Sequence, residues 1–168
     1  MAKRIDTATF KPNTVYVTII AATPEKVWQA LTGAEFTKQY FGGQTVEVES
    51  KAGGSFVMRM PDGSVNVKGE VVEWSPPRRF SCTWGFPQMP RLPECLVTYD
   101  IEPLGDAVKL TMTEAHSWDI PEALLSGGRQ GWPAILSSLK SLLETGKPLA
   151  VKIEPPKAMI QALKAFQD

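Results

Sequence analysis

The chain has few of the residues that would place it in a specialised class. It has two cysteines, Cys82 and Cys95, and a single histidine among 168 residues. These are too few for a disulfide scaffold or a usual structural zinc site. Lys plus Arg and Asp plus Glu number 18 each, so no net charge attracts nucleic acid or an anionic membrane. We therefore expect a reduced, cytoplasmic setting, with neither nucleic acid nor membrane as a partner.

Long apolar runs are also missing. No stretch approaches the roughly 18 apolar residues of a membrane-spanning helix, and the first residues, MAKRIDTATF, lack the apolar core of a signal peptide. Neither a glycine-rich phosphate loop nor a metal-ligand spacing is present, so we expect no cofactor and no metal. A chain of 168 residues with 43% hydrophobic content suits one globular domain with a real core.

Residues 126–146 predict one long amphipathic helix. Between Trp132 and Leu143 the large apolar residues recur at helical intervals and form one broad stripe. The Ser-Gly-Gly that opens the range is interpreted as the start of the helix, and Pro133 is then expected in the first turn, where its missing N–H costs nothing. Gly146 suits a left-handed stop. The apolar stripe requires a covering surface.

Segments with a two-residue hydrophobic period predict a β-sheet, which can cover the apolar stripe of the helix. Strands are expected at residues 15–20, 45–49, 55–60, 65–74, 80–84, 95–102 and 107–116. Thr23 and Pro24 begin a first short helix, and a second follows at about residues 34–40. Glycine and proline turns of hairpin length imply an antiparallel meander. The prediction is an α+β helix-grip fold, in which a curved seven-stranded antiparallel sheet wraps around a long C-terminal helix, with two short helices after the first strand.

Three segments divide the chain. We expect an N-terminal arm at residues 1–13, a helix-grip domain at 14–148 and a C-terminal tail at 149–168, which ends in a short amphipathic helix at about residues 157–166. Within the domain, residues 85–94 contain three prolines and predict a long loop at one rim of the sheet.

Four sequence stretches carry a resemblance to a known family. TPEKVWQALTGAEFTKQYFGG, GEVVEWSPPRRFSCTW, LTMTEAH and GWPAILSSLKSLLETGKP resemble the family related to the activator of the ninety-kilodalton heat-shock chaperone's ATPase. That family belongs to the START-like (SRPBCC) superfamily of the birch-pollen allergen and the steroidogenic lipid-transfer domain. The resemblance covers about residues 14–148 and implies a fold with an internal cavity. The superfamily hosts lipid carriers, cyclases, hydrolases and chaperone partners, so it does not fix the function.

One position departs from the family pattern. Many relatives have a Thr-His pair near the end of the last strand, whereas this chain has Thr113-Glu114 followed by Ala115-His116. We therefore do not assign to His116 any role that the histidine has in those relatives.

Alternation along the strands predicts which side chains face the long helix. The residues expected to bind a ligand between sheet and helix are Phe56, Met58, Phe80, Trp84, Tyr99, Met112, Glu114, His116, Trp132 and Leu136. Methionines supply an adaptable apolar lining, and the Tyr99 hydroxyl adds one polar group. The alternative is that the same side chains form an ordinary filled core.

Strand alternation also places the carboxylate of Glu114 on the apolar face. A buried, unpaired carboxylate is costly and has a raised pKa, so it would require a partner, with Tyr99, His116 or Arg59 as candidates. In that case Glu114 marks the polar end of a pocket. The alternative is that Glu114 lies where the strand ends and water reaches it.

The remaining chemistry-bearing residues favour structural roles. The pKa of a histidine suits a general base, but a lone histidine at a strand end without a supporting pattern is more typical of a structural residue. Cys82 and Cys95 have no histidine beside them in sequence and are expected to be buried small apolar residues. No catalytic constellation is evident, so the sequence favours a protein that is not an enzyme.

Three functions are therefore compatible with the sequence. The first is binding of a small, largely apolar ligand in an internal cavity. The second is an interaction module that resembles a chaperone cofactor, with a heat-shock chaperone as partner. The third is a cyclase- or hydrolase-type enzyme with Glu114 or His116 as the acid or base. Met159, Phe166 and the N-terminal arm also leave room for a homodimer.

Overall fold

The elements follow the predicted order. The structure, a computed structural model, describes residues 5–152 and 154–167. The strands are β1 (Lys11–Ile20), β2 (Thr45–Val48), β3 (Ser55–Arg59), β4 (Val65–Ser75), β5 (Arg79–Trp84), β6 (Cys95–Leu104) and β7 (Ala107–His116). The helices are α1 (Pro24–Thr32), α2 (Ala34–Tyr40), α3 (Glu122–Thr145) and α4 (Lys157–Leu163), with 3-10 turns η1 (Thr7–Thr9) and η2 (Lys164–Phe166).

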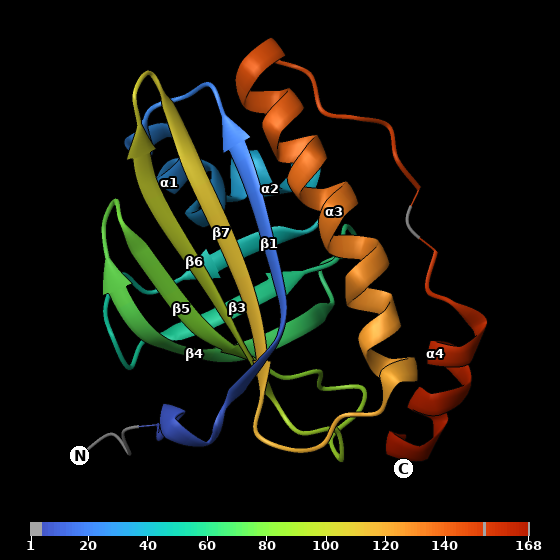
Figure 1. Ribbon diagram of the computed structural model, residues 1–168. Helices are drawn as coiled ribbons and strands as arrows, with labels where there is room; N and C mark the ends of the chain where they lie inside the picture. The colour runs from blue at the N-terminus through green and yellow to red at the C-terminus, as the bar shows by residue number, and fades with distance from the viewer. Residues whose placement is uncertain (1–4, 153, 168) are drawn as a thin grey trace.

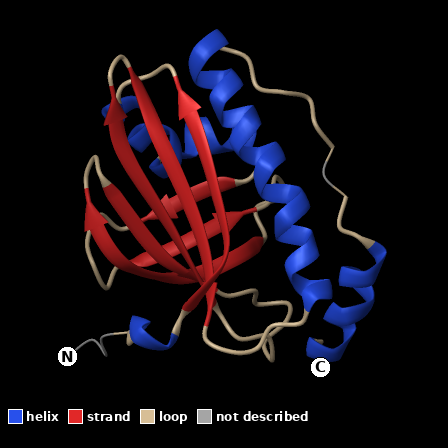
Figure 2. Ribbon diagram, in the orientation of Figure 1, coloured by secondary structure: helices blue, strands red, loops and turns tan. Residues whose placement is uncertain are grey.

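The described strands form one antiparallel seven-stranded sheet in the order β1-β7-β6-β5-β4-β3-β2. Figure 1 shows the sheet curving, with α1 and α2 on its inner side and α3 running beside β1. Helix α3 contacts β1, α1 and α2, and α4 packs against α3. Figure 2 shows that α3 and α4 lie on the same side of the sheet. The helix-grip fold predicted from the sequence is confirmed.

Local sequence chemistry explains the first helix and the end of α3. The Thr23 hydroxyl accepts a hydrogen bond from the Lys26 backbone N–H at 3.2 Å, and Pro24 occupies the first helical position of α1. Gly146 ends α3 with a left-handed φ of 82°, and its N–H bonds to the Leu142 carbonyl. Both helix ends behave as predicted.

The start of α3 differs from the prediction. The helix begins at Glu122, four residues before the predicted start, and Pro133 lies inside it. The apolar stripe extends upstream through the buried residues Leu124 and Leu125. Packing of that stripe outweighs the poor helix propensity of the glycine pair, which therefore lies within the helix and does not mark its start.

The first strand also begins earlier than predicted. Lys11 pairs with His116 and Pro12 with Ala115, so the last three residues of the predicted arm belong to β1. Pro12 is tolerated because β1 is an edge strand. The register shifts after Pro12, which leaves Asn13 as a bulge. Residues 1–4 of the predicted arm lie outside the described residues.

Aromatic rings fill the space between the centre of the sheet and the helices. Phe80 is fully buried and stacks on Tyr99 with ring centroids 6.1 Å apart. Phe56 stacks on Trp84 at 5.7 Å, and Trp84 contacts Trp132 at 5.4 Å. This continuous aromatic core fixes the distance between α3 and the sheet.

Candidate functional site

A partly open cavity of about 220 Å³ lies at one end of the sheet. Its walls come from the end of β5, the start of β6, the end of β7, the first half of α3, and α4, with the loop 86–93 and Ile120 completing them. These elements meet because antiparallel strands bring the end of β5 and the end of β7 to the start of β6. Most of the lining is apolar, and Glu114 and His116 supply a polar end.

Glu114 is the most buried carboxylate at this site, with 12% of its side chain exposed. Its Oε2 accepts a hydrogen bond from the Trp132 indole Nε1–H at 2.7 Å. Burial raises the pKa of Glu114 above its usual value, and the Trp132 hydrogen bond and the charge of Arg129 oppose that rise. Gly128 makes the approach possible, since a Cβ there would lie 3.1 Å from Glu114 Oε2.

His116 lies beside Glu114 and is 6% exposed. Its Nδ1 is 2.9 Å from Asn13 Oδ1, and its Nε2 is 3.7 Å from Glu114 Oε1. Burial lowers the pKa of His116, which favours the neutral imidazole. The bulge in β1 positions Asn13 for this contact, in keeping with the tendency of bulges to re-aim side chains near functional sites.

The structure separates the predicted ligand-binding residues into two groups. Trp84, Glu114, His116 and Trp132 lie together on the cavity wall. The other six do not line this cavity, because they pack into the core between the sheet and the helices; they are Phe56, Met58, Phe80, Tyr99, Met112 and Leu136. The predicted pocket is therefore displaced from the middle of the sheet to its end.

Two details of the predicted apolar face also need correction. The strand predicted at residues 55–60 ends at Arg59, and Met60 just beyond it is 37% exposed. Glu114 is largely but not fully buried, with 12% of its side chain exposed, and its hydrogen-bond partner is Trp132. Tyr99 and Arg59 were the wrong candidates, and His116 is near but beyond hydrogen-bond distance.

Helix α4 supplies a wall that the sequence did not predict. Met159 and Leu163 line the cavity, and Phe166 packs edge-on against Trp118 at 5.8 Å. The close packing depends on Gly127, because a Cβ there would lie 1.9 Å from the Met159 sulfur. The amphipathic spacing of the tail predicted a packed helix, but nothing in the spacing indicated which surface it covers.

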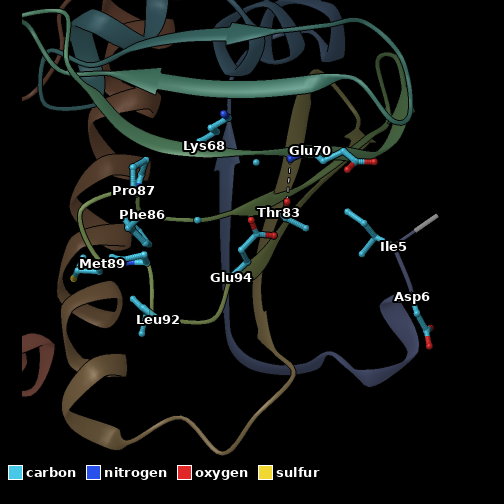
Figure 3. Close-up of a pocket in the computed structure, with 13 residues that line it drawn as sticks. Ile5, Asp6, Lys68, Glu70, Thr83, Phe86, Pro87, Met89, Leu92 and Glu94 are labelled. Atoms are coloured by element: carbon cyan, nitrogen blue, oxygen red, sulfur yellow. Dashed lines mark hydrogen bonds between the residues drawn. The ribbon is translucent and has the colours of Figure 1, made fainter. Parts of the chain in front are cut away.

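A second hollow, of about 730 Å³, is a more open groove that the loop 86–93 also lines. Figure 3 shows Lys68, Glu70 and Glu94 around it, together with Ile5 and a hydrogen bond from the Glu70 N–H to Thr83. Its charged rim of mixed sign contrasts with the mostly apolar wall of the 220 Å³ cavity. The more apolar cavity is the better candidate for binding an apolar molecule.

The other candidate groups are structural in their geometry. Cys82 and Cys95 are buried and free, and burial raises the pKa of both thiols. Among residues 5–152 and 154–167 there is no cluster of three metal-ligating side chains. No helix in the same ranges is long and apolar enough to cross a membrane.

The Trp132 hydrogen bond gives a first testable consequence. Trp132→Phe is expected to lower the free energy of unfolding by about 1–3 kcal/mol beyond the loss of ring area, because Glu114 loses its donor while still buried. Trp84→Phe is the matched control, since its indole donates only to the Cys82 sulfur. Urea denaturation of both variants measures the difference. Equal losses would show that the Glu114–Trp132 bond contributes nothing.

Glu114 also predicts a pH dependence of stability. Its pKa is raised above 4.5 in the folded chain, so the folded state holds this proton more tightly than the unfolded state. Its contribution to stability therefore falls as pH rises from about 4.5 through the raised pKa. Glu114→Gln is expected to remove that fall, and the wild-type-minus-variant difference in unfolding free energy across pH measures it.

The contribution of His116 to stability changes with pH in the opposite direction, so it must be separated from that of Glu114. Its lowered pKa means that its contribution is lost as pH falls below about 6.5. The Glu114→Gln difference curve cancels most of that contribution, because both proteins keep His116. From neighbouring elements, Trp132 and Arg129 lower the pKa of Glu114 against the effect of burial, and burial together with the Glu114 charge raises the pKa of Cys95 and Tyr16. A flat difference curve would show that Glu114 is not perturbed by burial.

The curved sheet, the helix that it grips and the cavity at their end define a protein of the helix-grip, START-like class. The chain belongs to the family described as Activator of Hsp90 ATPase homolog 1-like protein, which matches residues 21–144. The resemblance stated from the sequence is thereby confirmed. No curated protein matches the sequence.

Solved structures support the same fold. DynU16, from the dynemicin biosynthetic locus, is 26% identical with a TM-score of 0.69 over 80% of this chain, which spans 48% of the length of DynU16. CalU16 from Micromonospora echinospora is 19% identical, with a TM-score of 0.63 over 90% of this chain and 83% of CalU16. An HSP90 activator from Plasmodium falciparum, PFC0360w, is 21% identical, with a TM-score of 0.59 over 73% of this chain and 88% of its own.

Proposed function

We propose that this protein binds a small, largely apolar molecule in the cavity between the end of the sheet, α3 and α4. The observation that carries the proposal is the cavity itself, which is partly open, mostly apolar and lined by two titratable side chains. Ligand sites commonly combine an apolar wall with a few convergent polar groups.

The size of the cavity limits the ligand. Its volume of about 220 Å³ is below the roughly 300–1,000 Å³ usual for drug-sized ligands. We therefore expect a ligand of one or two rings. Met159 and Leu163 lie on the α4 wall, and the flexible methionine side chain permits adjustment to ligands of different shape.

Native mass spectrometry followed by denaturing extraction tests for a molecule that co-purifies with the chain. A panel of one- and two-ring apolar compounds, titrated by calorimetry, then tests binding in the cavity. Leu124→Phe, which narrows the cavity, is expected to lower affinity at least about ten-fold, whereas the volume-conserving Leu124→Met is expected to retain it. Absence of a bound molecule together with no binding by the panel would contradict the proposal.

A second candidate is a chaperone-cofactor role. The outward side chains of edge strand β1 form an exposed apolar row, in which Val15 is 55%, Val17 54% and Ile19 40% exposed. Exposed apolar patches are typical of interaction sites, and the family name and PFC0360w point to the ninety-kilodalton chaperone. Calorimetry with that chaperone, using wild type and Val15→Thr with Val17→Thr, tests this role. Equal binding by both proteins would exclude the β1 row.

The other functional expectations stay predictions. An acid–base role of Glu114 or His116 in a cyclase- or hydrolase-type reaction, a homodimer and a cytoplasmic setting each require their own experiment. One solved neighbour is an Aha1 dimer from Colwellia psychrerythraea, 19% identical with a TM-score of 0.63 over 79% of this chain and 96% of its own. Sedimentation of the purified chain would test whether it also forms a dimer.

A further inference from the structure

We infer that the polar end of the cavity selects apolar ligands that carry a hydroxyl group, which donates its hydrogen to His116 Nε2 beside Glu114. This inference rests on the proposed ligand-binding function and adds the chemical class of the ligand. It follows from the proton positions that the neighbours of His116 and Glu114 impose.

Asn13 sets the proton on the imidazole. The atom facing His116 Nδ1 is Asn13 Oδ1, at 2.9 Å. An amide oxygen only accepts hydrogen bonds, so Nδ1 carries the proton and donates it. In the neutral ring Nε2 is then an acceptor with a lone pair. Because Asn13 sits at a bulge of β1, the backbone of the sheet holds this arrangement in place.

Glu114 and His116 do not form a hydrogen bond with each other. Glu114 Oε2 is engaged by the Trp132 indole at 2.7 Å. Glu114 Oε1 lies 3.7 Å from His116 Nε2, which is too long for a direct hydrogen bond. Both side chains line the cavity. A group placed against both atoms can therefore donate to Nε2 and lie within reach of Oε1.

The surrounding charges favour a neutral hydroxyl over an ionic group. A carboxylate or phosphate would bring a second anion beside the buried Glu114 carboxyl, which is unfavourable. An ammonium group would lose its hydration in the mostly apolar cavity, and Arg129, whose charge acts on Glu114, offsets part of the attraction that the carboxylate offers in return. A purely apolar ligand end would displace water from the Nε2 lone pair and supply no donor in its place. A hydroxyl supplies one donor and can accept from Glu114 when that carboxyl is protonated.

A matched pair of probes tests the inference. 2-Naphthol and 2-methylnaphthalene differ only by hydroxyl against methyl and are titrated into the full chain by calorimetry. We expect wild type to bind 2-naphthol at least about ten-fold more tightly. His116→Phe, which keeps an apolar ring at this position, is expected to remove the preference while 2-methylnaphthalene still binds.

A second measurement examines Asn13 without relying on affinity. His116 is the single histidine of the chain, so ¹⁵N-histidine NMR reports its tautomer without ambiguity. We expect Nδ1 to be protonated and Nε2 unprotonated in wild type. Asn13→Ala, at an exposed position, is expected to mix the tautomers and reduce the preference for 2-naphthol. Asn66→Ala on β4 is the control and should change neither result.

The outcomes separate the inference from the proposed function. Equal affinity for the two probes would overturn the hydroxyl preference but leave the apolar site intact. A proton on Nε2 in wild type would also overturn it. Failure of both probes to bind would contradict the ligand-binding proposal and the inference with it. Tighter binding of 2-naphthol that is lost in His116→Phe would support both.

Discussion

Phe80→Ala is expected to lower the free energy of unfolding by about 3–5 kcal/mol. Phe80, near the start of β5, is fully buried and contacts Trp28, Trp74 and Phe56 as well as Tyr99. Removal of its ring leaves a void that these rigid aromatic neighbours fill only in part. Chemical denaturation with urea or guanidinium measures the loss.

The same variant distinguishes a filled core from a central pocket. Phe80→Leu, which keeps most of the side-chain volume, is the control. Its free energy of unfolding is expected to fall clearly less than that of Phe80→Ala. A loss below about 1 kcal/mol for Phe80→Ala would show that Phe80 already borders empty space. The ligand would then have room in the middle of the sheet, where the sequence had placed it.

Gly69→Ala is expected to be the most disruptive single-methyl change in the sheet, with a loss of about 3 kcal/mol or more. Gly69 lies on β4 where the strand passes β5, and a Cβ there would lie 1.7 Å from the Thr83 backbone carbonyl oxygen. A backbone oxygen in the sheet cannot move aside without breaking neighbouring strand contacts. The β4–β5 pairing must therefore open locally to admit the methyl group.

Gly53→Ala is the matched control for this substitution. Gly53 has a left-handed φ of +82°, and no atom lies within 4 Å of the place that an added methyl group would take, so its cost is conformational and about 1–2 kcal/mol. Thermal and urea unfolding of both variants compare the two causes. A Gly69→Ala variant no less stable than Gly53→Ala would show that β4 and β5 adjust freely at this point.

Most of the fold was predictable from the sequence because its signals are local. The two-residue period of the strands and the Thr23-Pro24 helix start depend on neighbouring residues, and both were confirmed. The start of α3 was wrong because Gly127 and Gly128 were interpreted as a helix boundary. Their small size serves contacts with Met159 and Glu114, which are distant in sequence.

The candidate site was predictable only in part, for a physical reason. Alternation along β7 placed Glu114 and His116 on the inner face, and helical spacing added Trp132. Alternation states which face a side chain occupies, but it does not state whether facing side chains meet. The rings around Phe80 meet and fill the centre, whereas the end of the sheet leaves a cavity. The bulge at Asn13 and the docking of α4 depend on tertiary contacts.

An apolar ligand that binds at the end of the sheet beneath α4 would be located most directly by a crystal structure of the protein with bound 2-naphthol. We expect electron density for the ring system between Trp132, Leu124 and Met159, with the hydroxyl oxygen within hydrogen-bond distance of His116 Nε2. Density in the open groove beside Lys68, or in the middle of the sheet beside Phe80, would contradict this placement of the ligand.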